Sequence, residues 1–197
     1  MKSMPSSQED FEIEQKDIVN LVKSKERRSE GDGGAKWSKF DADLACRVVK
    51  QFLKKHLPQE LKIVGPNVYI DGYPTEFDLL LVTHTAIPAA FTNAYRDQEV
   101  RLVIEVESHG RIDHEISSKL ATEFENLCFS YRNIKCTYLT IREAGNDEKT
   151  STGHIAELKK LLEPNCPIFC LAESTTYELI PGQWREFVNH VTTVSKL

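Results

Sequence analysis

Two apolar stretches that carry acidic residues constrain the fold more than any other part of this sequence. Residues 100–108 read VRLVIEVES and residues 75–82 read TEFDLLLV. Successive side chains of an extended strand point to opposite faces, so Glu105 and Glu107 share one face of the first stretch while its other face is apolar. In the second stretch Asp78 shares a face with Glu76, Leu80 and Val82. Both stretches therefore predict buried strands that carry carboxylates to one end of a sheet.

The same alternation assigns the apolar side chains of these predicted strands to faces. The strand at 100–108 should present one apolar face made of Val100, Leu102, Ile104 and Val106. The strand at 75–82 should present one made of Phe77, Leu79 and Leu81. The acids lie on the opposite faces.

Two acids side by side on a buried strand imply a compensating charge. Glu105 and Glu107 stand roughly 6 to 7 Å apart on the same face, where their charges repel, and a buried charge without a partner is costly. We therefore expect a cation, or a proton, between the carboxylates. The alternative is a sheet end whose acids face water, with Arg101 as the salt-bridge partner of Glu105.

Composition sets the class of protein. A chain of 197 residues suits one well-packed domain. With 25 Lys and Arg against 30 Asp and Glu the formal charge is −5, which argues against a protein that coats nucleic acid but not against an enzyme with a local basic groove. No apolar run approaches the roughly 18 residues of a spanning helix, and the N-terminus lacks a signal-peptide core. We expect an intracellular, cytoplasmic protein with no membrane partner.

The cysteines indicate thiols rather than a disulfide framework. Five is an odd number, and most of them sit inside apolar patterns, as reduced, buried thiols do. Cys166 and Cys170 lack a second pair, or a His, at zinc-ligand spacing. We therefore expect no zinc site.

Residues 1–36 predict an N-terminal helix or arm with a flexible linker, ahead of a main domain at 37–197. The apolar pattern from 9 to 28 predicts a short amphipathic helix that ends in the basic residues Lys23, Lys25, Arg27 and Arg28. This basic cluster is either a solvated helix end that complements the helix dipole or an arm that contacts phosphates. The Gly-containing stretch at 29–35 predicts the linker.

A first core helix is predicted over residues 38–57. Its apolar residues recur at helical spacing, Ser38 is a candidate N-cap, and Pro58 follows its end. Asp41 points into the apolar face. It is either a first-turn acid that interacts with the helix dipole or a further carboxylate aimed at the acidic site.

The remaining elements predict an α/β fold. Strands are expected at 61–64, 68–70, 75–82, 100–108, 134–141, 167–171 and 176–180, and helices at 112–132, 154–162 and 184–194. The first strands form a meander, while the connection through the helix at 112–132 is long enough for a parallel crossover. We therefore expect a mixed central sheet with helices on both faces.

The order of elements and the acidic motifs resemble the PD-(D/E)xK, or restriction-endonuclease-like, superfamily. The resemblance covers residues 36–141 and rests on Asp78 in EFDLLLV and on the apolar-Glu-x-charged motif in VIEVES. It implies an αβββαβ core in which an Asp and the first Glu bind magnesium. Carried over by position, Asp78 and Glu105 would be metal ligands, and the carbonyl of Val106 a third.

Glu107 stands where this family usually has the Lys that positions or deprotonates the attacking water, and Phe77 stands where it has Pro. The Pro is often absent, and a minority of restriction enzymes carry Glu-x-Glu at this strand and remain active. A Glu supplies a base or another metal ligand where Lys would supply positive charge. We therefore place Glu107 among both the catalytic and the metal-binding residues, and expect a stronger reliance on metal, with two ions.

Basic residues after the motif are further candidates. Some family members recruit a basic residue from the following helix, so Lys119 is a catalytic candidate, against the alternative of a solvated helix lysine. His109, Arg111 and His114 lie where a loop could meet a phosphate, or where a polar loop has no special role.

The resemblance implies a metal-dependent endonuclease that hydrolyses DNA phosphodiester bonds, with Mg²⁺ as cofactor and Mn²⁺ able to substitute. Double-stranded DNA is the expected partner, held by local basic residues: Lys50, Lys54, Lys55, Arg111 and the 23–28 cluster. Cutting both strands favours a homodimer. Two alternatives stay open: a catalytically inactive nuclease-like fold that binds nucleic acid or protein, and an α/β interaction protein unrelated to nucleases.

Overall fold

A computed structural model describes residues 7–30, 39–108, 114–142, 154–162, 165–173 and 176–194. In these segments the helices are α1 (Gln8–Glu30), α2 (Lys39–Leu53), α3 (His114–Ser130), α4 (His154–Leu162) and α5 (Gln183–Val194). The strands are β1 (Leu61–Val64), β2 (Val68–Ile70), β3 (Glu76–Phe77), β4 (Leu79–Thr83), β5 (Ala94–Tyr95), β6 (Val100–Glu107), β7 (Lys135–Arg142) and β8 (Ile168–Ala172).

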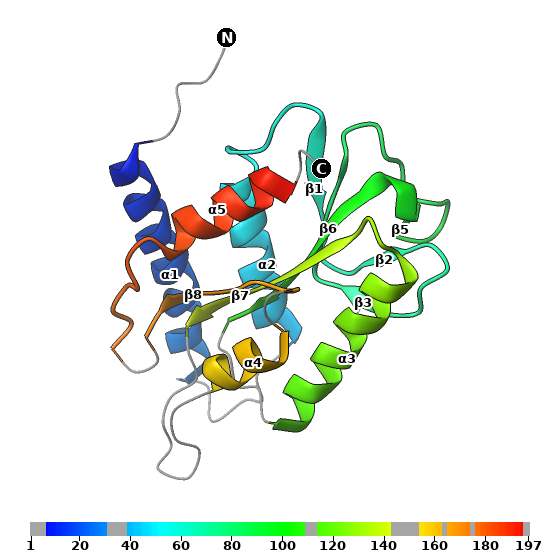
Figure 1. The fold of residues 1–197 in the computed structure, drawn as a ribbon. Helices are drawn as coiled ribbons and strands as arrows, with labels where there is room; N and C mark the ends of the chain where they lie inside the picture. The colour runs from blue at the N-terminus through cyan, green and yellow to red at the C-terminus, as the bar shows by residue number, and fades with distance from the viewer. Residues whose placement is uncertain are drawn as a thin grey trace.

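A five-stranded mixed sheet forms the centre of the molecule (Figure 1), in the order β1-β4-β6-β7-β8. The β1-β4 and β4-β6 pairs are antiparallel, whereas the β6-β7 and β7-β8 pairs are parallel. Because β6 and β7 are parallel, the chain must cross over between them, and α3 makes this crossover. The mixed α/β sheet expected from the sequence is confirmed.

A second, small sheet contradicts the single strand predicted at 75–82. The chain bends at Asp78, so that β3 joins β2 and β5 in a three-stranded sheet while β4 joins the central sheet. The bend also breaks the predicted face. Phe77 lies in the same core cluster as Leu80, not with Leu79, because alternation restarts after the bend.

A bulge between β4 and β6 changes the other predicted face. Leu81 pairs with Leu102, but the next pair is Val82 with Val100, which leaves Arg101 as the extra residue. Val100 therefore packs in the cluster opposite to that of Leu102, whereas strict alternation placed them together.

Two apolar clusters lie on the two faces of the central sheet. One packs side chains of β4 and β6 such as Leu81 and Ile104 against α1, α2 and α5. The other packs their neighbours, such as Leu80 and Val103, against α3, α4 and the small sheet. Figure 1 shows α1, α2 and α5 together on one side of the sheet and α3 on the other.

Helix α1 packs as part of this layered core. Ile18 and Val22 are buried in the same cluster as α2 and α5. The Gln15 side-chain amide donates to the carbonyl oxygens of Leu171 and Ile180, each at 2.8 Å. In the described residues α1 is thus a layer of the main core and not a detached arm, and the predicted linker falls mostly outside them.

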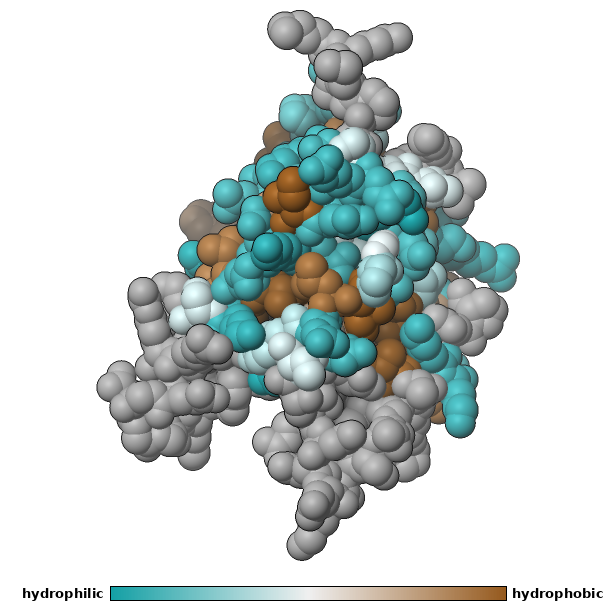
Figure 2. All heavy atoms as spheres, turned by 90° about the vertical axis from the view of Figure 1, so that its left-hand side faces the viewer, coloured by the Kyte–Doolittle hydropathy of each residue, from teal (hydrophilic) through white to brown (hydrophobic). Residues whose placement is uncertain are grey.

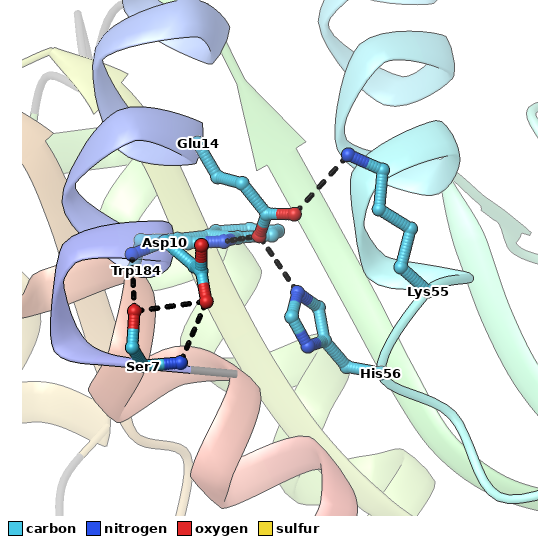
Figure 3. A network of polar contacts seen from close by, with 6 residues as sticks. All are labelled: Ser7, Asp10, Glu14, Lys55, His56 and Trp184. Carbon is cyan, nitrogen blue, oxygen red and sulfur yellow. Dashed lines mark hydrogen bonds and ion pairs between the residues drawn. The ribbon is translucent and has the colours of Figure 1, made fainter. Parts of the chain in front are cut away.

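Glu14 joins α1 to the end of α2 and to α5 (Figure 3). One carboxylate oxygen accepts from Trp184 Nε1 at 2.9 Å and lies 2.7 Å from His56 Nε2. The other accepts from Lys55 Nζ at 3.1 Å. Trp184 is fully buried, so this network fixes the packing of three helical segments.

The side of the molecule that carries α1 is covered mainly by hydrophilic residues, with apolar residues gathered between them (Figure 2). Ile13 and Leu21 contribute exposed apolar surface to α1. None of the helices in the described segments is long and apolar enough to cross a membrane.

The predicted strand at 176–180 is wrong. In the described residues this segment makes one isolated bridge, between Ala172 and Leu179, before the chain enters α5. Two backbone hydrogen bonds accompany this bridge, from the Glu173 N–H to the Glu178 carbonyl at 2.9 Å and from the Ile180 N–H to the Leu171 carbonyl at 3.0 Å. The segment therefore lies against the end of β8 without forming a strand of its own.

Candidate active site

Asp78 sits at the bend between β3 and β4, and the turn after β1 holds the backbone there. Gly65 in that turn has φ +120°, and a Cβ at this position would lie 2.2 Å from the Asp78 carbonyl oxygen. Only glycine fits such a close approach with this backbone conformation. The Asp78 side chain is held from the other strand, because the Val106 backbone N–H donates to its Oδ2 at 2.8 Å.

Glu105 meets Asp78 across the antiparallel β4-β6 ladder. Leu79 pairs with Ile104, so the next step along the ladder brings Asp78 opposite Glu105. The two side chains share a hydrogen bond, and the Asp78 backbone N–H donates to the Glu105 carboxylate. The structure therefore brings these two carboxyl groups within hydrogen-bonding reach of each other.

The electrostatics of the pair follow from burial and like charge. Burial raises the pKa of Asp78 despite the hydrogen bond from Val106. Burial raises the pKa of Glu105 well above its ordinary value of 4.5, and the charges of Asp78 and Glu107 raise it further. None of the main influences on these two pKa values, within the described part of the chain, is a basic side chain.

Glu107 lies at the end of β6, where solvent reaches it. Protein still surrounds its carboxyl group closely enough that burial, followed by the charge of Asp78, raises the pKa of Glu107 to about 7. Among the described residues no group of three or more His, Cys, Asp or Glu side chains is arranged to hold one metal ion. Asp78 and Glu105 thus form a close pair, and Glu107 stands beside it without completing a three-carboxylate cage.

Cys46 is a neighbour of the pair that the sequence analysis missed. It is fully buried on α2, and its thiol is hydrogen-bonded to the Asp78 carboxyl group. Burial and the charge of Asp78 raise the pKa of Cys46, so it stays a thiol and donates. Its place on the apolar stripe of the predicted helix gave no signal beyond core packing.

Tyr138 is a second missed neighbour. It pairs with Glu105 in the β6-β7 register and is 1% exposed. Its hydroxyl is buried without a hydrogen-bond partner in the described structure. Burial, followed by the charges of Glu107, Glu105 and Asp78, raises the pKa of Tyr138 far above 10.0. An unpartnered hydroxyl in the field of three acids marks Tyr138 as part of the same site.

Two basic residues that the sequence named as candidates, Lys119 and Arg101, have no hydrogen bond or ion pair with the acidic pair in the described structure. Lys119 is exposed on α3. The Arg101 guanidinium donates to the carbonyl oxygens of Gln98 at 2.7 Å and Val100 at 3.3 Å. It is therefore bound within its own segment, and the salt bridge to Glu105 offered as an alternative is not formed.

Some predicted residues fall outside the description. His109 and Arg111 lie outside the described residues, and the side chains of Asp41 and His114 are not described either. Asp43, an acid on α2 whose side chain is described, acts on Asp78: the charge of Asp43 raises the pKa of Asp78.

Four residues of the predicted basic groove have described side chains, and three of these have contacts within the protein. Lys50 is half-buried and its ammonium donates to the Gly65 carbonyl oxygen at 2.5 Å. Lys55 belongs to the carboxylate network of Figure 3, and Lys23 lies over an aromatic ring at 4.1 Å. Lys54 is exposed.

Comparisons with known proteins rest on structure. No family model matches the sequence, and a comparison with curated proteins gives no match. The solved structure of Pseudomonas aeruginosa ATCC27853 NucC in its cAAA-bound form aligns with a TM-score of 0.56 and 10% identity, covering 83% of this chain and 74% of that chain.

Two further solved structures align more weakly. Apo NucC of Escherichia coli MS115-1 has a TM-score of 0.47 and 12% identity, with 81% of this chain and 71% of that chain covered. Pyrococcus furiosus SfsA in complex with Ca²⁺ has a TM-score of 0.37 and 13% identity, with 68% and 59% covered. The fold comparison therefore rests on the first alignment, and the chain has a mixed α/β, restriction-endonuclease-like fold similar to that of NucC.

Proposed function

We propose that this chain is a metal-dependent endonuclease that hydrolyses DNA phosphodiester bonds at the Asp78–Glu105 pair. The observation that carries this proposal is the contact itself: two carboxyl groups from adjacent strands meet where burial raises both pKa values. Clustered acids without a basic partner are typical of sites that bind a divalent cation. The fold shared with NucC supports the same class of enzyme.

The donor set fits a hard divalent cation. Mg²⁺ is held in proteins by one or two carboxylates together with substrate phosphates and waters, so a third carboxylate is not required. Asp78 and Glu105 would hold the ion, with the Val106 carbonyl as a further ligand, and Mn²⁺ would substitute. When bound, the ion supplies positive charge that favours the ionised carboxylates and neutralises the non-bridging oxygens of the scissile phosphate.

Glu107 is the proposed general base. Burial and the charge of Asp78 raise its pKa to about 7 in the metal-free protein. It lies at the solvent-accessible end of β6, where as a carboxylate it would accept a proton from the attacking water. The water oxygen attacks phosphorus in line, the 3′ oxygen leaves and takes up a proton, and the product keeps a 5′ phosphate. Lys119, exposed on α3, would assist only by adding positive charge nearby.

Double-stranded DNA is the proposed substrate, and two copies of the chain would be needed to cut both strands symmetrically. Most of the predicted basic residues that the structure describes have internal contacts, so phosphate contacts would come from exposed residues such as Lys54. Binding should weaken steeply as salt concentration rises.

The test compares plasmid cleavage by the wild type with that of Asp78→Asn and Glu105→Gln in Mg²⁺ or Mn²⁺. These substitutions keep side-chain shape and remove like charge, so the variants should fold. We expect cleavage to fall by more than about 100-fold, because even outer-shell partners of a metal are worth about 10–100-fold. Glu76→Gln, an exposed acid on β3, is the matched control and should cleave as the wild type does.

Lys119→Ala decides between the two roles of that lysine. An unchanged cleavage rate would show that Lys119 is a solvated helix lysine. A lower cleavage rate in a normally folded variant would show that Lys119 takes part in catalysis. If wild type, Asp78→Asn and Glu105→Gln all cleave equally, the proposed site is wrong.

A second candidate function is a nuclease-like fold that binds nucleic acid or protein without cutting. The observation that favours it is Glu107 in the place of the family's Lys, together with the lack of a three-acid metal group among the described residues. Such a module would bind DNA equally well before and after Glu105→Gln, with no cleavage by either protein. Calorimetry with Mn²⁺ separates the cases, since a catalytic site should lose its Mn²⁺ affinity on Glu105→Gln.

A further inference from the structure

Two cysteines outside the acidic site lie within reach of each other. Cys128 is near the C-terminal end of α3 and Cys136 is the second residue of β7, and their sulfur atoms are 3.7 Å apart. The short connection between them is held by the Tyr131 N–H bond to Leu127 and the Ile134 N–H bond to Tyr131, at 2.8 and 3.0 Å. The pair is therefore fixed by ordered backbone on both sides.

An open cavity gives access to this pair. It has a volume of about 290 Å³ and is lined by residues of α3, the start of β7, the end of α4 and the segment after α4. Cys128 lines it and is half-buried, whereas Cys136 lies behind it at 1% exposure. Small molecules can reach the Cys128 sulfur while the Cys136 sulfur stays protected.

The electrostatics divide the roles of the two sulfurs. A hydrogen bond with Cys136 and the charge of Lys135 lower the pKa of Cys128 to about 7, against the opposing effect of burial. The same hydrogen bond, together with burial, raises the pKa of Cys136. At pH 7 a pKa of about 7 leaves about half of Cys128 as thiolate, to which the Cys136 thiol can donate. In its thiol form Cys128 donates to the Ile134 carbonyl oxygen at 3.9 Å. The thiolate is the reactive form of cysteine.

Basic side chains also favour an anion at this place. Two basic side chains, Arg132 and Lys135, and one acid, Glu125, line the same cavity as Cys128. Positive charge next to a partly exposed sulfur, with a second thiol in reach, is the environment of a peroxide-reactive cysteine with a resolving partner.

We propose that Cys128 and Cys136 form a peroxide-reactive dithiol site, in which Cys128 is the nucleophile and Cys136 the resolving thiol. This inference is independent of the acidic site and of the proposed nuclease activity. The oxidant is a small hydroperoxide, such as hydrogen peroxide, that fits the cavity.

The first step forms a sulfenic acid. The Cys128 thiolate attacks the terminal oxygen of the hydroperoxide, an S–O bond forms, and the O–O bond breaks. The leaving alkoxide, or hydroxide, takes up a proton and departs as alcohol or water. Cys128 is oxidised by two electrons and the peroxide is reduced by two.

The second step closes a disulfide. The Cys136 sulfur loses its proton and attacks the Cys128 sulfur, the S–S bond forms, and the S–O bond breaks with loss of hydroxide, which the proton converts to water. The sulfurs need only approach from 3.7 Å to about 2.05 Å. The sum of both steps is two thiols and one peroxide giving one disulfide, one water and one alcohol or second water.

Tryptic mapping of the full chain tests this proposal directly. Cleavage after Lys119, Arg132, Lys135 and Arg142 places Cys128 in peptide 120–132 and Cys136 in peptide 136–142. The reduced protein is treated with one equivalent of hydrogen peroxide, its remaining thiols are alkylated, and the masses of the tryptic peptides are measured by mass spectrometry. We expect the two peptides to be joined, lighter by two hydrogen atoms than their sum.

Cysteine variants assign the order of events. In Cys136→Ala the Cys128 sulfenic acid should persist and be trapped by dimedone, and alkylation of Cys128 at pH 7 should slow by about tenfold as its thiolate fraction falls. In Cys128→Ser, Cys136 should stay reduced. Cys170→Ser is the control and should form the 120–132 to 136–142 link as the wild type does.

Cys166 offers the sharpest contrary outcome because it lines the same cavity. It falls in peptide 161–185. A link between 120–132 and 161–185, equal oxidation of all five cysteines, or unreacted Cys128 in the folded wild type would each overturn the proposal.

Discussion

Glu14 and the Asp78–Glu105 pair, both in the described part of the molecule, hold their carboxyl groups in opposite ways. Glu14 is bound by Trp184, His56 and Lys55, and these hydrogen bonds lower its pKa below 4.5 although burial acts against them. The Asp78–Glu105 pair is half-buried beside a further acid, and the pKa of both residues is raised. Glu14 is therefore stable as a charged group within the protein alone, whereas the pair is stable only with a proton or a cation added.

This difference separates a structural acid from a candidate functional one. The partners of Glu14 come from the end of α2 and from α5, so the carboxylate works as a joint between helices (Figure 3). The partners of Asp78 are a backbone N–H, the Cys46 thiol and another acid. Burial with no basic side chain among the main influences makes the Asp78–Glu105 pair a candidate functional site.

The largest effect is expected at the structural site. Glu14→Ala leaves the Trp184 indole N–H and His56 without their acceptor, and should lower the free energy of unfolding by about 3 kcal/mol, the lower end of the range for broken buried pairs, because Lys55 is 53% exposed. Urea unfolding at pH 7 measures it. Glu12→Ala, an exposed acid on the same helix, should change stability by less than about 0.5 kcal/mol. Equal losses in the two variants would show that the Glu14 network contributes nothing.

The next effect is specific to the acidic pair. Mn²⁺ at about ten times its dissociation constant should stabilise the wild type by about 1.4 kcal/mol, through binding to the folded state alone. Thermal unfolding with and without Mn²⁺ measures the shift in Tm. Asp78→Asn should lose the shift, while Glu14→Gln should keep it. A shift of the same size in Asp78→Asn would place the ion elsewhere.

The pH dependence should have opposite signs at the two places. Glu14 has a lowered folded pKa, so its contribution is present above pH 4.5 and is lost as pH falls through the lowered value. The site acids have raised folded pKa values. Their contribution to the free energy of unfolding is therefore most favourable at low pH, and it declines as pH rises from 4.5 through about 7, the pKa of Glu107.

Urea unfolding in EDTA across pH 5 to 8 tests the second half of this statement. Glu107→Gln should flatten the decline by about 1 kcal/mol, a value reduced for the solvent exposure of Glu107. Added Mg²⁺ should flatten it in the wild type. A metal-free wild type that gains stability over this range would contradict the raised pKa values.

The sequence alone predicted the acids and the sheet that carries them, because alternating strands and helical spacing are local patterns. It did not predict the bend at Asp78, since the close approach of Gly65 to the Asp78 carbonyl comes from a turn more than ten residues earlier. Strict alternation therefore misplaced Phe77. The bulge that misplaced Val100 is also set by pairing with another strand.

Local sequence patterns also did not predict which residues from other helices and strands lie next to the acids. Cys46 and Tyr138 reach the acids from α2 and β7, and both residues look like ordinary core positions in the sequence. Lys50 was expected to help hold DNA, but its ammonium donates to the Gly65 carbonyl oxygen. Tertiary contacts decide these cases, and a single sequence does not encode them as a local period.

The smallest expected effect on stability comes from removing one hydrogen-bonding group from the Glu14 network and one from the acidic site. Each donor to Glu14 has its acceptor, so Trp184→Phe should be destabilising by about 1 kcal/mol or more. Tyr138→Phe removes a buried hydroxyl that has no partner in the described structure. It should leave stability unchanged or raise it by up to about 1 kcal/mol, because an unsatisfied polar group costs that much to bury. Urea unfolding of the metal-free protein measures the difference.

If the Tyr138 hydroxyl contributes to the acidic site when metal and DNA are bound, Tyr138→Phe should also cleave DNA more slowly than the wild type at saturating metal. A Tyr138→Phe protein that is destabilised and cleaves normally would make Tyr138 a core residue and return the site to its three acids.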